Sequence, residues 1–115
     1  MDNKQYQVLK IYASTTDRLG HQLLYERLVY LAREQGLSGV TVYRGIMGYG
    51  SSSRQINSSK FWELTEKLPV MIEIVDEAAV LHRFFESIRQ ELLDMPKGCM
   101  VTLEPLQILM LKSGK

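Results

Sequence analysis

The sequence predicts an α+β fold in which two helices cover one face of a four-stranded antiparallel sheet. Short apolar stretches with period-two alternation are interspersed with two segments whose apolar residues recur at helical spacing. These segments follow the order strand, helix, strand twice along the chain. Right-handed crossovers in both repeats place the two helices on the same side of the sheet. This arrangement is the ferredoxin-like βαββαβ fold.

The first repeat consists of a strand over residues 8–13, a helix over residues 20–35 and a strand over residues 39–43. Apolar side chains alternate with polar ones in both strands and form one stripe along the helix. Residues 14–17 contain the Ser, Thr and Asp side chains that favour a helix N-cap. Gly36 is expected to end the helix, because glycine adopts the left-handed conformation found there.

The second repeat consists of a strand over residues 69–75, a helix over residues 77–94 and a strand over residues 99–103. Asp76 is a good N-cap for this helix. Pro96 follows the helix as its breaker. The helix carries an apolar stripe at helical spacing, which predicts its core face: Leu81, Phe84, Phe85, Ile88 and Leu92.

After the second repeat, the sequence predicts a bend or bulge at Glu104–Pro105. A short fifth strand is expected over residues 106–111, followed by a frayed end over residues 113–115.

A long segment separates the two repeats. It is rich in glycine and serine from Gly45 to Ser53 and polar through Lys60. About 20 residues without clear periodicity in a compact domain are typical of a functional or disordered loop. We therefore expect a flexible loop over about residues 51–67, with one helical turn at residues 61–66.

Composition and charge limit the class of protein. The 115 residues are 45% hydrophobic and 23% charged, which predicts one globular domain over residues 1–115. The net charge of +1 argues against a broad DNA- or RNA-binding surface. A single cysteine, a polar N-terminus and no long apolar run predict a cytoplasmic protein.

The two helices leave the other sheet face uncovered. That face is predicted to carry five apolar residues among polar ones: Val8, Tyr12, Met71, Val75 and Met100. A half-apolar open face on so small a domain indicates self-association.

Three motifs in the sequence resemble a known family. The first is GVTVYRGIMGYG at residues 39–50, the second LPVMIEIVD at residues 68–76, and the third GCMVTLE at residues 98–104. The first two are similar to the PII signalling proteins, in which a glycine-rich turn leads into the long T-loop. All three resemble a PII-like family, the domain-of-unknown-function family numbered 190, over nearly the whole chain.

The resemblance implies a regulatory protein. PII proteins are trimers that bind adenine nucleotides in clefts between subunits and move their T-loops against enzymes or membrane transporters. Carried over to this chain, the implied ligand-binding residues are Arg44, Gly45, Gly48, Tyr49, Gly50, Ser51, Ser52, Lys97 and Gly98. The implied partner-binding residues of the loop are Arg54, Phe61 and Trp62. PII proteins have Arg-Gln where this chain has Ser51–Ser52, so the ligand is expected to be a small anion, with an adenine nucleotide as one form.

Two alternatives share the same fold class. One is a divalent-metal tolerance protein or structural trimer of the CutA type, and the other is a small enzyme of the dimeric α+β-barrel kind. His21, His82 and Cys99 do not have the spacing of metal ligands. No motif pairs a nucleophile with a base, so the sequence predicts no enzyme and no metal site.

Overall fold

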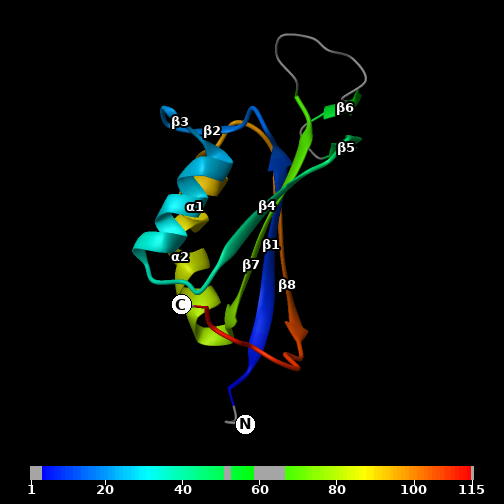
Figure 1. Ribbon diagram of the computed structural model, residues 1–115. Coiled ribbons are helices and arrows are strands. Elements are labelled where there is room, and N and C mark those ends of the chain that lie inside the picture. Colours follow the sequence, from blue (N-terminus) through cyan, green and yellow to red (C-terminus); the bar gives the residue numbers. More distant parts are fainter. Residues whose placement is uncertain (1–3, 51–52, 59–66, 115) are drawn as a thin grey trace.

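The computed structural model describes residues 4–50, 53–58 and 67–114. In these residues the elements follow one another as Figure 1 labels them. They are β1 (Tyr6–Ser14), β2 (Arg18–Leu19), β3 (Gln22–Leu23), α1 (Leu24–Glu34), β4 (Val40–Arg44), β5 (Met47–Gly50), β6 (Ser53–Ser58), β7 (Pro69–Glu77), α2 (Ala78–Asp94) and β8 (Met100–Leu106).

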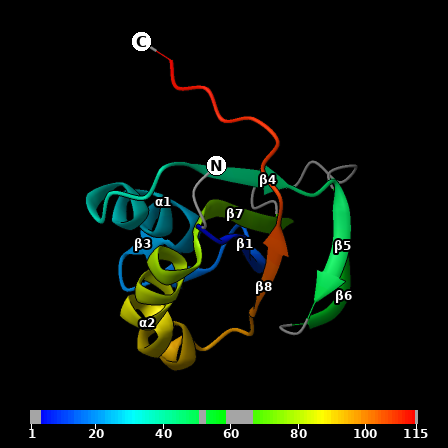
Figure 2. The ribbon, with the colours of Figure 1, turned by 90° about the horizontal axis from the view of Figure 1, so that it is seen from below.

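The main sheet has the strand order β4-β7-β1-β8, and every neighbouring pair is antiparallel. Both helices cover one face of this sheet, and Figure 2 shows them on the side opposite to β5 and β6. This order, with the helices following β1 and β7, is that of the ferredoxin-like fold. The predicted fold class is therefore confirmed.

The core lies between the helices and the covered face of the sheet. Its fully buried side chains come from β1, β7 and both helices: Ile11, Ile72, Ile74, Leu24, Leu28, Leu81, Phe84 and Ile88. The strand residues alternate along each strand, so that every second one meets the helices. Phe85, predicted for the core, is partly buried at its margin.

Helix α1 begins four residues later than predicted. Residues 18–23 instead form the small β2–β3 pair, which turns at Gly20 with a φ of +62°. The N-cap was expected within residues 14–17, but it is Leu23, without a side-chain hydrogen bond. The Asp17 carboxylate accepts the Ser14 N–H at 2.9 Å and so stabilises the preceding turn instead.

The end of α1 matches the prediction. Gly36 has a φ of +80°, and its N–H donates to the Arg33 carbonyl at 3.1 Å. The Leu37 N–H donates to the Ala32 carbonyl at 3.0 Å, which completes a glycine-terminated helix end.

The N-cap predicted for α2 is wrong by one residue. The structure places Glu77 at the cap, again without a side-chain hydrogen bond. The Asp76 carboxylate accepts the N–H groups of Ser38 and Glu77, at 2.9 and 2.7 Å. It therefore ties the start of β4 to the end of β7.

Strand β8 is longer than predicted and has no bulge. Its pairing with β1 is continuous from Met100 to Leu106, and residues 107–114 contain no fifth strand. Pro105 lies within β8, an edge strand of the sheet, which is where proline is tolerated in strands.

The long connection after β4 contains regular structure that was not predicted. Strand β5 pairs with β6, and the register shifts between Gly48 and Gly50. We call this pair the ribbon. Figure 2 shows that it stands out on the open side of the main sheet. The helical turn predicted at residues 61–66 lies outside the described residues.

Candidate functional site

A pocket of about 560 Å³ lies where β1 and β4 end and β7 begins. This volume is within the range of small-molecule sites. Its lining consists of Thr15, Thr16, Arg18, Leu23, Tyr25, Val42, Arg44 and Val70. Val70 belongs to the core cluster and Val42 packs against it, so the pocket opens on the helix side of the sheet.

The loop between β1 and β2 forms one wall of the pocket, and several hydrogen bonds fix its position. Thr15 donates its N–H to the Leu68 carbonyl at 2.9 Å, and its hydroxyl accepts the Leu68 N–H at 3.1 Å. The Asp17 carbonyl accepts the Leu24 N–H at 2.8 Å, which joins the loop to the first turn of α1. Leu19 is buried in the core and anchors the loop from below. The wall is therefore held rigidly to β7 and α1.

Two arginines face this pocket from different elements. Arg44 is the last residue of β4, and alternation along the strand places it on the same side as Val42. Arg18 belongs to β2, where its guanidinium donates to the His21 carbonyl at 3.0 Å. This bond occupies one donor and holds the side chain beside the loop, so other guanidinium donors are left for a ligand.

The pocket is suited to an anion with an apolar body. Among the described residues, its lining contains two guanidinium groups and no carboxylate, so these residues favour negative charge in the pocket. An arginine fork can bind a carboxylate or phosphate through two parallel hydrogen bonds. Leu23, Val42 and Val70 provide an apolar wall, and Tyr25 adds a ring and a hydroxyl.

The ribbon begins directly beside this pocket. The N–H of Gly45, the residue after Arg44, donates to the Pro69 carbonyl at 2.7 Å. A Cβ atom added at Gly45 would lie 3.3 Å from Pro69 Cβ, and one at Gly48 would lie 3.0 Å from Pro69 Cγ. The two glycines therefore let the chain pass closely over the start of β7. We call this contact the glycine–proline contact.

Substituting Gly48 by alanine is expected to displace the ribbon and destabilise the protein by roughly 1–3 kcal/mol. The Gly48 φ of +157° disfavours a side chain, and the new Cβ would meet the rigid Pro69 ring. Gly50→Ala is the matched control, because no atom lies within 4 Å of a Cβ built there. Urea unfolding of both variants measures the difference, and equal losses would contradict the close approach to Pro69.

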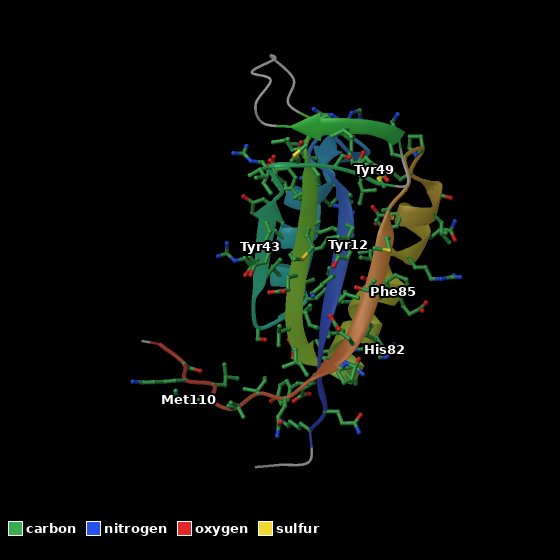
Figure 3. All side chains as sticks on the ribbon, turned by 90° about the vertical axis from the view of Figure 1, so that its right-hand side faces the viewer. Tyr12, Tyr43, Tyr49, His82, Phe85 and Met110 are labelled. Carbon is green, nitrogen blue, oxygen red and sulfur yellow. The ribbon has the colours of Figure 1, made fainter. Side chains whose placement is uncertain are left out.

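The other predicted ligand residues do not all reach the pocket. Tyr49 extends from the ribbon with 64% of its surface exposed, and Figure 3 shows it on the open side of the sheet. Lys97 and Gly98 precede β8, whereas Arg44 ends β4. These two strands form opposite edges of the sheet, so one chain does not bring the residues together. Gly50 ends β5, away from the pocket lining.

Several predicted positions have no described side chain. Ser51, Ser52, Phe61 and Trp62 lie outside the described residues. Arg54 lies in β6, and only its place in the strand is described. Their ligand- and partner-binding roles stay predictions.

Of the residues that line the pocket, sequence reasoning identified only Arg44 as a ligand residue. Thr15 and Thr16 were interpreted as N-cap candidates and Tyr25 as a position on the helix, and Arg18 was given no role. Polar residues of this kind are common at helix starts, so the pattern alone favoured that interpretation. The available signal was the run of five polar residues from Ser14 to Arg18 after the predicted strand, which is longer than an N-cap requires.

The candidate chemical groups outside the pocket are dispersed. His21 and His82 are both exposed, on the β2–β3 turn and on α2. Among the described residues, no group of three or more His, Cys, Asp or Glu side chains could hold a metal ion. In the same residues, no helix is both long and apolar enough to span a membrane.

Cys99 is half-buried before β8, and burial raises its thiol pKa, with a further contribution from the Asp17 carboxylate. The folded state therefore favours the protonated thiol. The Cys99 thiol contributes its full stabilisation of the folded state below the thiol pKa of the unfolded chain, about 8.5. This stabilisation is lost as the pH rises through the higher thiol pKa of the folded chain.

We accordingly expect the native thiol to react with iodoacetamide at pH 8 at least several-fold more slowly than the urea-unfolded chain. Between pH 8 and 10, unfolding free energy should fall more steeply for the natural chain than for Cys99→Ala. Identical slopes for the two proteins would contradict the raised pKa.

Comparison with known proteins places this chain in a family. A model of the family described as "DUF190: Uncharacterized ACR, COG1993" matches residues 6–108. The chain belongs to the DUF190 family. A UPF0166 protein of Aquifex aeolicus (strain VF5) is 34% identical over 104 residues, which cover 90% of this chain and 93% of that protein. A UPF0166 protein of Methanocaldococcus jannaschii is 35% identical over 98 residues, with 82% and 89% covered.

Solved structures show the same fold at low identity. A PII-like signalling protein of Thermus thermophilus has a TM-score of 0.62 at 18% identity, covering 92% of this chain and 91% of that chain. CPII of Thiomonas intermedia K12, a nitrogen regulatory PII-like protein bound to ADP, AMP and bicarbonate, has a TM-score of 0.61 at 15% identity, with 90% and 94% covered. The GlnK–ATP complex of B. subtilis has a TM-score of 0.52 at 15% identity, with 89% and 84% covered. This DUF190 chain therefore has the PII-like fold, as its motifs predicted.

Proposed function

We propose that this DUF190 protein is a cytoplasmic, non-enzymatic PII-like regulator. A small anionic ligand binds in the pocket between Arg18 and Arg44. Binding changes the position of the ribbon, which then docks on or releases a partner protein such as a membrane transporter or an enzyme. The protein acts as a homo-oligomer, with a trimer as the expected form.

One observation carries this proposal: a residue that lines the pocket is followed directly by the residue that leads into the ribbon. Arg44 lines the pocket, and Gly45 begins the close passage over Pro69 that positions the ribbon. A ligand that pulls the Arg44 side chain into the pocket would also bias the glycine–proline contact. Such a ligand can shift the equilibrium between two ribbon positions only if it binds the chain more tightly in one position than in the other. A sensor requires that ligand binding in the pocket changes the position of the ribbon, and this short connection provides a route for that change.

The ligand class follows from the pocket lining. The guanidinium groups of Arg18 and Arg44 favour a carboxylate, bicarbonate or phosphate group. The apolar wall favours a ligand that also has a planar apolar part. The structural relative solved with ADP, AMP and bicarbonate supports testing these molecules first. An adenine nucleotide would place its phosphates at the arginines and its base near Tyr25.

Lys97 and Gly98 fit the proposal only through assembly. They lie at the β8 edge, far from Arg44 in the same chain. A neighbouring copy packed against that edge would bring its own pocket region close to them. On this proposal, Lys97 and Gly98 of a second copy contribute to the site.

A thermal-shift screen beside light scattering tests the function. ADP, AMP, ATP, cyclic AMP and bicarbonate are each added to the full chain, and a ligand that binds only the folded state raises the melting temperature. Limited proteolysis of the ribbon is followed with and without that ligand. The expected result is one or more stabilising anions that also change ribbon cleavage. A monomer that none of these ligands stabilises or protects would overturn the proposal.

A further inference from the structure

Asp17 is the one charged residue that is buried in the described part of the chain, with 3% of its surface exposed. It lies between β1 and β2, in the loop that forms one wall of the pocket. Burying a carboxylate is costly, because the charge loses its hydration. The amide oxygen of an asparagine could accept the same Ser14 N–H with a smaller loss of hydration. The charge of Asp17 therefore indicates a role beyond closing the turn.

The loop that carries Asp17 has two faces. We call residues 14–18 the wall loop. Thr16 and Arg18 line the pocket and are exposed, whereas Asp17 between them is turned into the protein. The Asp17 N–H donates to the Ser14 carbonyl at 3.1 Å, which holds the loop in this orientation. A shift of the backbone that moves Thr16 and Arg18 therefore also moves the carboxylate between them.

The segment before β8 lies at the buried side of the wall loop. The antiparallel register pairs Tyr12 of β1 with Met100 of β8. Continued by one residue, this register brings Cys99 to the level of Ala13, next to the start of the wall loop. Ala13 and Cys99 both pack against the core cluster. Figure 1 shows the β1–β2 connection and the chain that enters β8 at the same end of the sheet.

The electrostatics of Cys99 agree with this position. Burial raises the pKa of the Cys99 thiol most, and the Asp17 carboxylate raises it further. A Coulomb interaction of this kind weakens with distance, so the carboxylate lies on the side of the wall loop that faces the thiol. Lys97 and Gly98, two of the predicted ligand residues, directly precede Cys99. Asp17 therefore stands between the pocket and this segment.

We propose that Asp17 is a positioning residue that links the anion pocket to residues 97–99. An anion bound at Arg18 fixes the pocket face of the wall loop, and the carboxylate on the other face then holds the segment before β8. The pocket thus acts on two edges of the sheet, on the ribbon through Gly45 and on residues 97–99 through Asp17. The inference rests on the anion binding in the proposed function, and it adds a second route by which binding changes the chain.

Alkylation of the natural Cys99 thiol reports on this link. The full chain reacts with iodoacetamide at pH 8, alone and with saturating ADP, AMP or bicarbonate, whichever raises the melting temperature most. We expect the anion to slow the reaction by about threefold or more, because it restricts local opening around the half-buried thiol. In Asp17→Asn the anion should still raise the melting temperature, because Arg18 and Arg44 are unchanged, but it should not slow the alkylation.

Asp76→Asn is the matched control for this experiment. The Asp76 carboxylate also accepts backbone N–H groups, but it lies near the end of β7, whereas the pocket lies at the start of that strand. This variant should keep the slowing of the natural chain. Asp17→Ser is a second test variant, since a serine hydroxyl can close the turn without a charge. It should lose the slowing as Asp17→Asn does, and urea unfolding checks that each variant is folded.

A measurement without ligand tests the position of Asp17 separately. Loss of the carboxylate should speed alkylation of the free chain by about twofold or more at pH 8, because more of the thiol is then ionised. Equal rates for Asp17→Asn and the natural chain would overturn the proximity of Asp17 to the thiol.

The outcomes with ligand separate this link from the proposed function. An anion that stabilises the natural chain without slowing its alkylation would overturn the link and leave the proposed function intact. Equal slowing in the natural chain and in Asp17→Asn would do the same, because the anion would then protect the thiol directly or by stabilising the whole fold. A natural chain that none of these anions stabilises would overturn the proposed function and the link with it.

Discussion

Replacing Arg44 by alanine should weaken binding of the anionic ligand that we propose for the pocket by about tenfold to a hundredfold. Hydrogen bonds to charged groups contribute about 1.5–3 kcal/mol each, and Arg44 is one of two cations in the lining. Isothermal titration with the anion that gives the largest thermal shift measures the loss. Because the Arg44 side chain is exposed at a strand end, the fold itself should lose little stability.

Conservative and matched variants make this prediction specific. Arg44→Lys keeps the positive charge but loses the planar fork, so it should recover only part of the affinity. Arg33→Ala removes an exposed arginine from the last turn of α1, outside the pocket, and should leave the affinity unchanged. A uniform small loss in both alanine variants would indicate a general effect of net charge and would contradict a site at Arg44.

A double-mutant cycle tests whether the two arginines hold one ligand. If Arg18 and Arg44 bind the same anionic group, the loss in Arg18→Ala with Arg44→Ala should differ from the sum of the single losses. Strict additivity would place the two guanidinium groups on separate parts of a ligand. The outcome therefore reports the size of the ligand as well as the site.

The regular part of the fold could be predicted from the sequence because its pattern repeats. Alternation placed Ile72 and Ile74 in the core, and Gly36 ended α1 where the left-handed conformation required it. Both signals are local and depend on one strand or one turn. The order of elements then left few topologies, because crossovers are short and right-handed.

The helix starts could not be predicted by the same reasoning. Asp17 and Asp76 are strong N-cap residues, yet each carboxylate binds a backbone N–H outside the helix it precedes. Tertiary contacts gave these side chains better partners than their helices did. Capping preferences describe a local competition, and the sheet changes its outcome.

The pocket depends on long-range contacts, so only part of it was predicted. Arg44 was identified from its motif, but its partner Arg18 lies 26 positions earlier and reaches it only through the folding of the first repeat. The contact between Thr15 and Leu68 joins segments 53 residues apart. Neither pairing produces a pattern that can be recognised in a single sequence, whereas the glycine-rich turn is a local motif.

Phe84→Ala should give the largest loss of stability in the chain, about 3–5 kcal/mol. Its ring is fully buried on α2, within the cluster formed with β1 and β7. Removing it leaves a cavity beneath the strands that carry the pocket wall and the glycine–proline contact. Since small domains have a total stability of about 5–15 kcal/mol, this loss would leave a marginal fold.

Phe85→Ala is the matched control for this prediction, since the same atoms are deleted one position along the helix. Phe85 is only partly buried, so its loss should cost about 1 kcal/mol. Urea unfolding followed by circular dichroism gives both values. Both phenylalanines fit the apolar stripe in the sequence, and only the rotation of α2 on the sheet distinguishes them. Equal losses would mean that α2 packs with a different face on β1 and β7. The core beneath the pocket would then be arranged differently from the one described.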